Sequence, residues 1–204
     1  MALQFVNIVK ARITQTWLST LLIRGGYRVT RLGIEELCGE IKYLDLPAYM
    51  ALNLPLQLRY LPDLLVADGA TKNAYLVEVK FRQKFTDASA KDIHEELCKQ
   101  RQHWPESYAV VMIAEPFVVG GRFHQDYIRI VRPQQTDMLV SDNLTPQQRW
   151  DGLPPLYHVF RGLNETWLLY NADSMTPALR ELSQLQEKWT ADSPFSPSFI
   201  HKAH

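Results

Sequence analysis

The chain has 204 residues, 46% hydrophobic and 22% charged, and its 22 basic and 22 acidic side chains give a formal net charge of zero. This length and composition are typical of one globular domain with a single substantial core, and they exclude a disordered or fibrous chain. Zero net charge argues against a protein that binds nucleic acid by a strongly basic overall surface, so any surface that contacts DNA has to be local.

No stretch of the sequence has the pattern of a membrane segment or a secretory leader. The longest apolar stretches, residues 17–23 and 109–114, are far shorter than the roughly 20 residues of a membrane-spanning helix. The first residues mix polar and basic side chains with apolar ones. The two cysteines, Cys38 and Cys98, are far apart in sequence and suggest neither a disulfide framework nor a zinc-binding pair. We therefore expect a cytoplasmic protein with no membrane association.

The first third of the chain predicts a helix, a strand and a second strand. Residues 5–24 carry apolar side chains at three- and four-residue steps, and Gly25-Gly26 follows them, which predicts an amphipathic helix with a defined end. Residues 27–32 alternate in period two and predict the first strand. Residues 34–44 return to helical spacing. Residues 57–67 are interpreted as the second strand, after an irregular segment that contains two prolines.

The middle of the chain predicts a hairpin, a helix and a buried strand. Residues 68–73 are rich in aspartate, glycine and asparagine, which tolerate the backbone angles of a tight reversal. They should join two antiparallel strands, the second at residues 74–81. Residues 90–104 predict a helix that ends before a proline, and residues 108–114 predict a buried strand. The core order up to residue 114 is therefore helix, strand, strand, strand, helix, strand. Residues 127–131 predict one more strand.

The last seventy residues have a weaker pattern. We expect a helix from Thr145-Pro146 onward, strands at residues 156–160 and 166–170, and a helix at residues 177–189. The resulting interpretation divides the chain into a core at residues 1–134 and a C-terminal extension at residues 135–204. The extension is expected to pack on the same domain, with a loose tail from residue 193.

Two short motifs bring acidic and basic residues onto neighbouring strands. Leu61-Pro62-Asp63 lies in the second predicted strand, and Val77-Glu78-Val79-Lys80 lies in the third. Glu78 and Lys80 are two residues apart, so their side chains leave the same face of the sheet. An antiparallel pairing would bring the Asp63 carboxylate toward that of Glu78. Two carboxylates with a backbone carbonyl and waters suit Mg²⁺ or Mn²⁺, and Lys80 would orient or activate the attacking water.

Together the motifs resemble the PD-(D/E)XK nuclease superfamily, which is built on the same order of helix, three strands, helix and strand. The resemblance covers residues 5–115. It implies a restriction endonuclease-like α/β fold, with a three-layer α/β/α core, a mixed central sheet and, here, a C-terminal extension. It also implies hydrolysis of DNA phosphodiester bonds through a metal-activated water, with Asp63, Glu78 and Lys80 catalytic. Asp63, Glu78 and the carbonyl of Val79 would bind the metal.

Two further positions are candidate site residues. Many members of the resembled family supply another carboxylate from the first helix, whereas that helix carries Gln4 and Gln15 here and no acid. Glu35 or Glu36 could substitute, or both could be solvated helix positions. Gln100 followed by Trp104 resembles a glutamine-plus-aromatic element of exonuclease-like branches; the alternative for Gln100 is an exposed helix residue.

Basic residues gather in the middle of the chain, as a groove that follows phosphates would require. Acidic residues lie among them, so an ordinary mixed-charge surface is the alternative. The basic residues are Arg59, Lys72, Arg82, Lys84, Lys91, Lys99 and Arg101. His94 and His103 have no third ligand of matching spacing, which argues against a zinc site.

Three functions are compatible with the sequence. The first is a Mg²⁺- or Mn²⁺-dependent nuclease with DNA as its partner and a homodimer as an open option. The second is a catalytically inactive protein of the same fold that binds nucleic acid or protein in a DNA-processing or defence assembly. The third is a structural homo-oligomer, in which Asp63 is a solvated turn residue and Glu78 and Lys80 form a simple ion pair on one strand.

Overall fold

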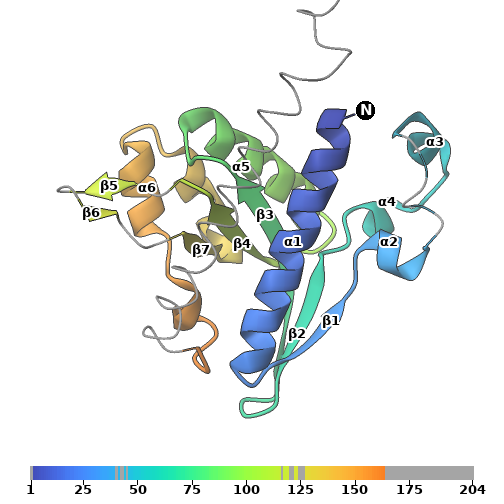
Figure 1. The fold of residues 1–204 in the computed structure, drawn as a ribbon, viewed down its shortest axis with the longest axis horizontal. Helices are drawn as coiled ribbons and strands as arrows, with labels where there is room; N and C mark the ends of the chain where they lie inside the picture. Colours follow the sequence, from blue (N-terminus) through green and yellow to red (C-terminus); the bar gives the residue numbers. More distant parts are fainter. Residues whose placement is uncertain are drawn as a thin grey trace, which may run out of the picture.

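A five-stranded mixed sheet forms the centre of the computed structural model, which describes residues 2–39, 41, 44, 46–115, 117–119, 122–123 and 127–163. The strand order is β1-β2-β3-β4-β7, and helices lie against both faces of the sheet (Figure 1). The strands are β1 (Arg28–Arg31), β2 (Leu64–Asp68), β3 (Asn73–Arg82), β4 (Tyr108–Ile113) and β7 (Ile128–Val131). The expected mixed α/β class is therefore confirmed.

The pairing of the strands follows from the connections between them. β2 and β3 pair antiparallel, as the turn chemistry of residues 68–73 predicts, and β1 adds antiparallel to β2. β3 and β4 pair parallel, which requires a crossover, and α5 (Asp87–Arg101) provides it. Thr86 and Ser89 begin α5 with a capping box, in which each side chain accepts from the other residue's backbone N–H. β7 closes the order antiparallel to β4.

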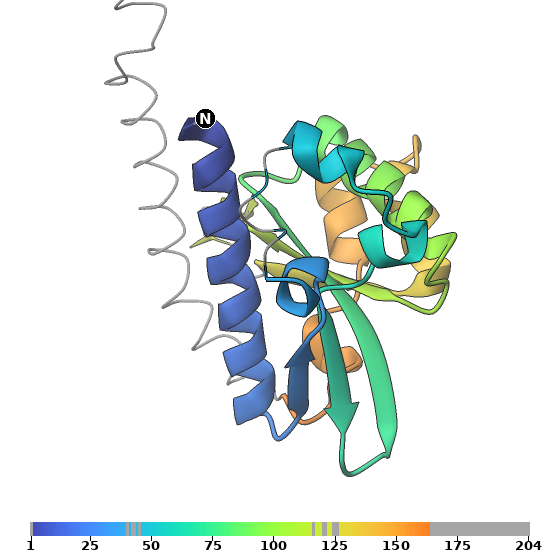
Figure 2. The ribbon, with the colours of Figure 1, turned by 90° about the vertical axis from the view of Figure 1, so that its right-hand side faces the viewer.

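The two faces of the sheet are covered by different helices, and Figure 2 shows α1 (Ala2–Arg24) and α5 on opposite sides of it. Leu18, Leu21 and Leu22 of α1 pack against strand residues that include Val110 and Met112. Ile93 and Leu97 of α5 pack against the alternating residues of the same strand, among them Val111. Because β4 is buried on both faces, its sequence is continuously apolar.

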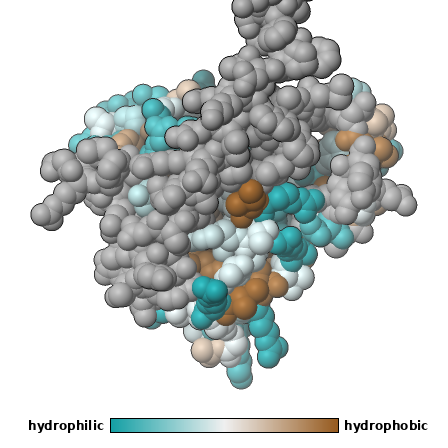
Figure 3. Space-filling view, viewed as in Figure 1, coloured by the Kyte–Doolittle hydropathy of each residue, from teal (hydrophilic) through white to brown (hydrophobic). Residues whose placement is uncertain are grey.

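From Ala11 to Arg24, α1 exposes both hydrophobic and hydrophilic side chains. Ile13 and Ile23 remain exposed on this helix, and Figure 3 shows small hydrophobic patches beside hydrophilic ones on the face where α1 lies. Within the described part of the chain, no helix combines the length and apolarity needed to cross a bilayer.

The segment after β7 wraps around the edge of the sheet. It contains two short 3-10 helices, η2 (Pro133–Val140) and η3 (Leu156–His158), and the helix α6 (Pro146–Gly152) between them. Leu139, Trp150 and Leu153 join the core on the α5 side. Leu156, Phe160 and Leu163 join the core on the α1 side. The chain changes sides at Pro154, whose carbonyl accepts a hydrogen bond from Ile130 N at 3.0 Å, so the edge of β7 is partly covered.

Several sequence-based boundaries are wrong. Residues 57–67 do not form one strand, because Pro55 begins a helical turn, α4 (Leu56–Arg59), and β2 starts only at Leu64. Residues 156–160 contain η3 in place of the expected strand; Pro155 precedes this turn, and the neighbouring Pro154 already bonds to β7. The helix expected at residues 34–44 is reduced to α2 (Ile34–Leu37).

Other differences concern short elements. α3 (Leu46–Ala51) occupies the segment expected to be irregular. A small hairpin of β5 (Val118–Val119) and β6 (Arg122–Phe123) was not expected. The strand at residues 166–170, the helix at residues 177–189 and the tail from residue 193 lie outside the described residues.

The contact between the C-terminal segment and the loop after α1 gives a test of this packing. Gly162 N donates to the Tyr27 hydroxyl at 2.7 Å, and a methyl group at Gly162 would collide with the backbone carbonyl of Gly25. We expect Gly162→Ala to lower the free energy of unfolding by about 1–3 kcal/mol in a urea titration. Gly69→Ala is the control, because nothing lies within 4 Å of its added methyl. Equal stability of the two variants would contradict the docking of this segment.

Candidate active site

Glu78 and Lys80 lie side by side on the face of β3 that is turned toward α5. Their side chains are only 12% and 18% exposed, and Lys80 Nζ lies 2.8 Å from Glu78 Oε1. Glu96, from α5, brings a second carboxylate to Lys80, with Nζ to Oε2 also 2.8 Å. The expected common face of Glu78 and Lys80 is confirmed, and the lysine is held between two carboxylates from different elements.

Helix α5 also fixes the Glu78 carboxylate. Gln100 Nε2 donates to Glu78 Oε2 at 2.6 Å, while Ser107 Oγ donates to Gln100 Oε1 at 3.4 Å. Gln100 is only 5% exposed, so it is not the exposed helix residue of the alternative interpretation. Glu96 and Gln100 are four residues apart and therefore share one helix face. Both oxygens of Glu78 thus have a defined donor.

Asp63 contacts the same segment of β3 at the edge of the strand that pairs with β2. It lies one residue before β2 and outside the strand in which it was expected. Its Oδ2 accepts from Val79 N at 2.7 Å, and its Oδ1 accepts from Gln15 Nε2 of α1 at 2.7 Å. The antiparallel hairpin therefore brings the Asp63 carboxylate against the residue between Glu78 and Lys80.

The backbone of Val79 completes a possible set of oxygen ligands. In a strand, the N–H and C=O of one residue leave on the same side, so the carbonyl of Val79 faces the side on which Asp63 lies. Hard divalent ions take carboxylate and carbonyl oxygens. The described residues contain no group of three or more His, Cys, Asp or Glu side chains that could hold a metal. The candidate ligand set consists of the carboxylates of Asp63 and Glu78 and the backbone carbonyl of Val79, so only two of its members are side chains.

The charges around Lys80 favour its protonated form. Burial would lower the pKa of Lys80, but the adjacent Glu78 and Glu96 carboxylates outweigh burial and hold this pKa above its ordinary value. For Glu96, burial would raise the pKa, whereas Lys80 and Arg82 lower it more strongly, so its pKa is below the ordinary value. Lys80 is therefore an ammonium at neutral pH, suited to orient a water or stabilise negative charge and not to accept a proton.

Glu36 and Trp104 have partners outside this cluster. Glu36 pairs with Arg12 of α1. Glu35 belongs to α2, but its side chain is outside the described part of the structure. Trp104 Nε1 donates to the Gln57 carbonyl at 3.0 Å, so its ring anchors the α4 region and does not extend the site.

Three residues of the cluster were missed in the sequence. Glu96 could have been found, because it precedes Gln100 by one helical turn and follows the buried Ile93. Ser107 and Gln15 carry no such local signal. Gln15 stands in α1 where an acid was sought, and its amide donates to Asp63, so the first helix contributes a neutral donor to the cluster.

Many of the basic residues of the middle segment have structural partners. Arg82 pairs with Glu96, Lys84 pairs with Glu115, and Arg59 donates to the carbonyls of Met50 and Leu54. Arg101 donates to the carbonyls of Ser107, Val131 and Pro133, and burial lowers its pKa. Exposed positions remain at Lys72, Lys91 and Lys99. A groove that follows phosphates would depend on these three more than on the other four.

The ion pair between Glu96 and Lys80 predicts a specific loss of stability in acid. Because the pKa of folded Glu96 lies below its ordinary value of 4.5, the pair contributes stability above that pH and loses it as the pH falls through the folded pKa. We expect that in Glu96→Gln the free energy of unfolding falls less steeply with decreasing pH in the acid range than in wild type. Glu96 is 46% exposed, so solvent screening limits the difference to about 1 kcal/mol.

Glu95→Gln is the matched control for this acid titration, because Glu95 is the exposed neighbour in the same helix. Urea titrations at several pH values below 4.5 would give both curves. If Glu95→Gln and Glu96→Gln have the same acid limb, the ion pair makes no contribution in solution.

Comparison of the chain with protein-family models, with curated proteins and with solved structures gave no match.

Proposed function

We propose that the chain is a Mg²⁺- or Mn²⁺-dependent nuclease of restriction endonuclease-like fold, which hydrolyses DNA phosphodiester bonds through a metal-activated water. The observation that carries the proposal is the hydrogen bond between Asp63 Oδ2 and Val79 N. It brings a second carboxylate to the strand segment that already holds Glu78 and Lys80. The helix, the three antiparallel strands, the crossover helix and the parallel fourth strand support the same assignment.

The balance of charge in the cluster favours a bound cation. The carboxylates of Asp63, Glu78 and Glu96 outnumber the cations of Lys80 and Arg82. A divalent ion held by Asp63, Glu78 and the Val79 carbonyl would polarise the phosphate and lower the pKa of a coordinated water. The partial burial of Glu78 strengthens its attraction for such an ion.

The remaining residues would position the reactants. Lys80 carries a charged Nζ beside Glu78 and would stabilise the negative charge that develops on the phosphate. Gln100 holds the Glu78 carboxylate in one orientation, and Gln15 does the same for Asp63. We therefore assign Gln100 and Gln15 as positioning residues of the proposed site.

Conservative substitutions test the proposed catalytic residues. We expect Asp63→Asn, Glu78→Gln and Lys80→Met each to lower the rate of DNA cleavage in Mg²⁺ or Mn²⁺ by about 100-fold or more, because each removes a charge that acts on the reacting phosphate or its metal. The assay compares plasmid and linear single-stranded DNA, with EDTA as the metal-free control. Glu95→Gln and Arg28→Gln, both at exposed positions, should retain the wild-type rate.

Folding of each variant is checked by its thermal midpoint, so that loss of activity is separated from loss of structure. Equal cleavage by wild type and folded Glu78→Gln would contradict the proposed site. The same assay at several protein concentrations, with sedimentation velocity, determines whether a homodimer is the active form.

The second candidate function is a catalytically inactive protein of the same fold that binds nucleic acid or protein. The observation that favours it is that the charged groups of the cluster have hydrogen-bond or ion-pair partners within the protein. Lys80 lies between two carboxylates, and both oxygens of Asp63 accept hydrogen bonds from the protein. A network in which every member is satisfied stabilises the fold. In this second function, the charged residues stabilise the fold and do not catalyse a reaction.

Metal titration separates the two functions. A ligand that binds only the folded state raises the unfolding free energy by RT ln(1 + [L]/Kd). For a nuclease we expect Mg²⁺ or Mn²⁺ to raise the thermal midpoint of wild type and to leave that of Asp63→Asn unchanged. An unchanged wild-type midpoint together with DNA binding in EDTA would support the inactive binding protein.

A further inference from the structure

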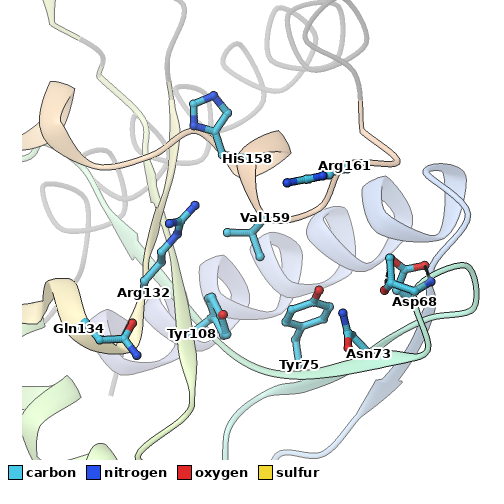
Figure 4. A pocket seen from close by; sticks show the side chains of 10 residues that line it. Asp68, Asn73, Tyr75, Tyr108, Arg132, Gln134, His158, Val159 and Arg161 are labelled. Atoms are coloured by element: carbon cyan, nitrogen blue, oxygen red, sulfur yellow. Dashed lines mark hydrogen bonds between the residues drawn. The ribbon is translucent and has the colours of Figure 1, made fainter.

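A cavity of about 490 Å³ opens on the α1 side of the sheet. Its residues come from the β2–β3 hairpin, from β4, and from the chain around the start of η2 and around η3. Figure 4 shows Tyr75 and Asn73 of the sheet opposite Val159 and Arg161 of the C-terminal segment across this space. The lining that matters for its chemistry consists of Asn73, Tyr75, Tyr108, Arg132, His158 and Arg161.

This cavity is separate from the candidate active site. Tyr75 shares a strand face with Val77, and both contact the core cluster on the α1 side. Glu78 and Lys80 leave the opposite face of the same strand, because side chains alternate along β3. The sheet therefore stands between the cavity and the side chains of Glu78 and Lys80.

The charge of the cavity favours an anion. Arg132 and Arg161 bring two guanidinium groups to it, and His158 adds an imidazole. Among the lining residues, the acid is Asp68, and its carboxylate accepts hydrogen bonds from Ala70 N and the Thr71 hydroxyl at 2.8 Å each. The turn holds this carboxylate, which keeps its charge, so the lining has two guanidinium groups against one carboxylate. Guanidinium groups are donors suited to a phosphate.

The rings in the cavity are held in fixed positions. The Tyr75 ring packs edge-on against Tyr108, with centroids 5.6 Å apart, and against Phe160, with centroids 5.3 Å apart. Fixed aromatic rings offer a surface for a flat ring of a ligand, and the amides of Asn73 and Gln134 offer hydrogen bonds to its edge. The volume lies within the range of small-ligand pockets.

We propose that this cavity binds a nucleotide, with its phosphate held by Arg132 and Arg161 and its base against Tyr75 and Tyr108. The nucleotide is either free or the terminal residue of a nucleic-acid strand, since both present the same phosphate next to a flat ring. This proposal does not depend on the catalytic role of Glu78 and Lys80.

Calorimetry with the full chain in EDTA tests the proposal, because EDTA removes any contribution of a metal at the carboxylate cluster. We expect AMP to bind at least about tenfold more tightly than adenosine, since the charged phosphate meets two guanidinium groups. Arg132→Gln and Arg161→Gln should each weaken AMP binding by about tenfold or more. Arg28→Gln removes the same charge from an exposed position of β1 and should leave AMP binding unchanged.

Two oligonucleotides, with and without a 5′-phosphate, distinguish the source of the nucleotide. Tighter binding of the phosphorylated strand than of AMP assigns the cavity to a strand end, and the reverse order assigns it to free nucleotide. Equal affinity for AMP and adenosine would overturn the proposal, as would an equal effect of Arg132→Gln and Arg28→Gln. Glu78→Gln should bind AMP like wild type. The AMP measurement therefore tests the nucleotide cavity independently of the proposed nuclease activity.

Discussion

The candidate active site depends on one contact, the hydrogen bond from Val79 N to the Asp63 carboxylate. Asp63 stands before β2 and would otherwise be an isolated acidic residue in a loop. The hairpin of β2 and β3 returns the chain so that this loop meets the middle of β3. Because the side chains of Glu78 and Lys80 and the backbone of Val79 belong to consecutive residues, this single contact brings all the proposed reacting groups into one neighbourhood.

The helices on the two faces hold that neighbourhood in place. Gln15 of α1 binds Asp63, whereas Glu96 and Gln100 of α5 bind Lys80 and Glu78. Each charged group therefore has a partner on a different element, and the partly buried charges are compensated as folding requires. The same arrangement would hold carboxylates ready for a cation, and this link between structural compensation and proposed catalysis is why metal binding is the decisive measurement.

The C-terminal segment uses the sheet in another way. It crosses the edge of β7 at Pro154 and places residues on both faces, so the core is completed by parts of the chain far from the motifs. On the α1 side it brings His158 and Arg161 over the strand residues Tyr75 and Tyr108. The proposed nucleotide cavity thus exists only because this segment is docked, and Gly162 lies within that docking contact.

The sequence by itself determined the features that depend on local periodicity and turn chemistry. Alternation along β3 put Glu78 and Lys80 on one face, residues 68–73 made the hairpin antiparallel, and helical spacing located α5. Tertiary structure alone decided which groups meet, since Gln15 and Asp63 are 48 residues apart and Gln100 and Glu78 are 22 apart. It also turned residues 156–158 into a helical turn. Periodicity specifies the face on which a side chain lies, whereas its partner is set by packing between distant elements.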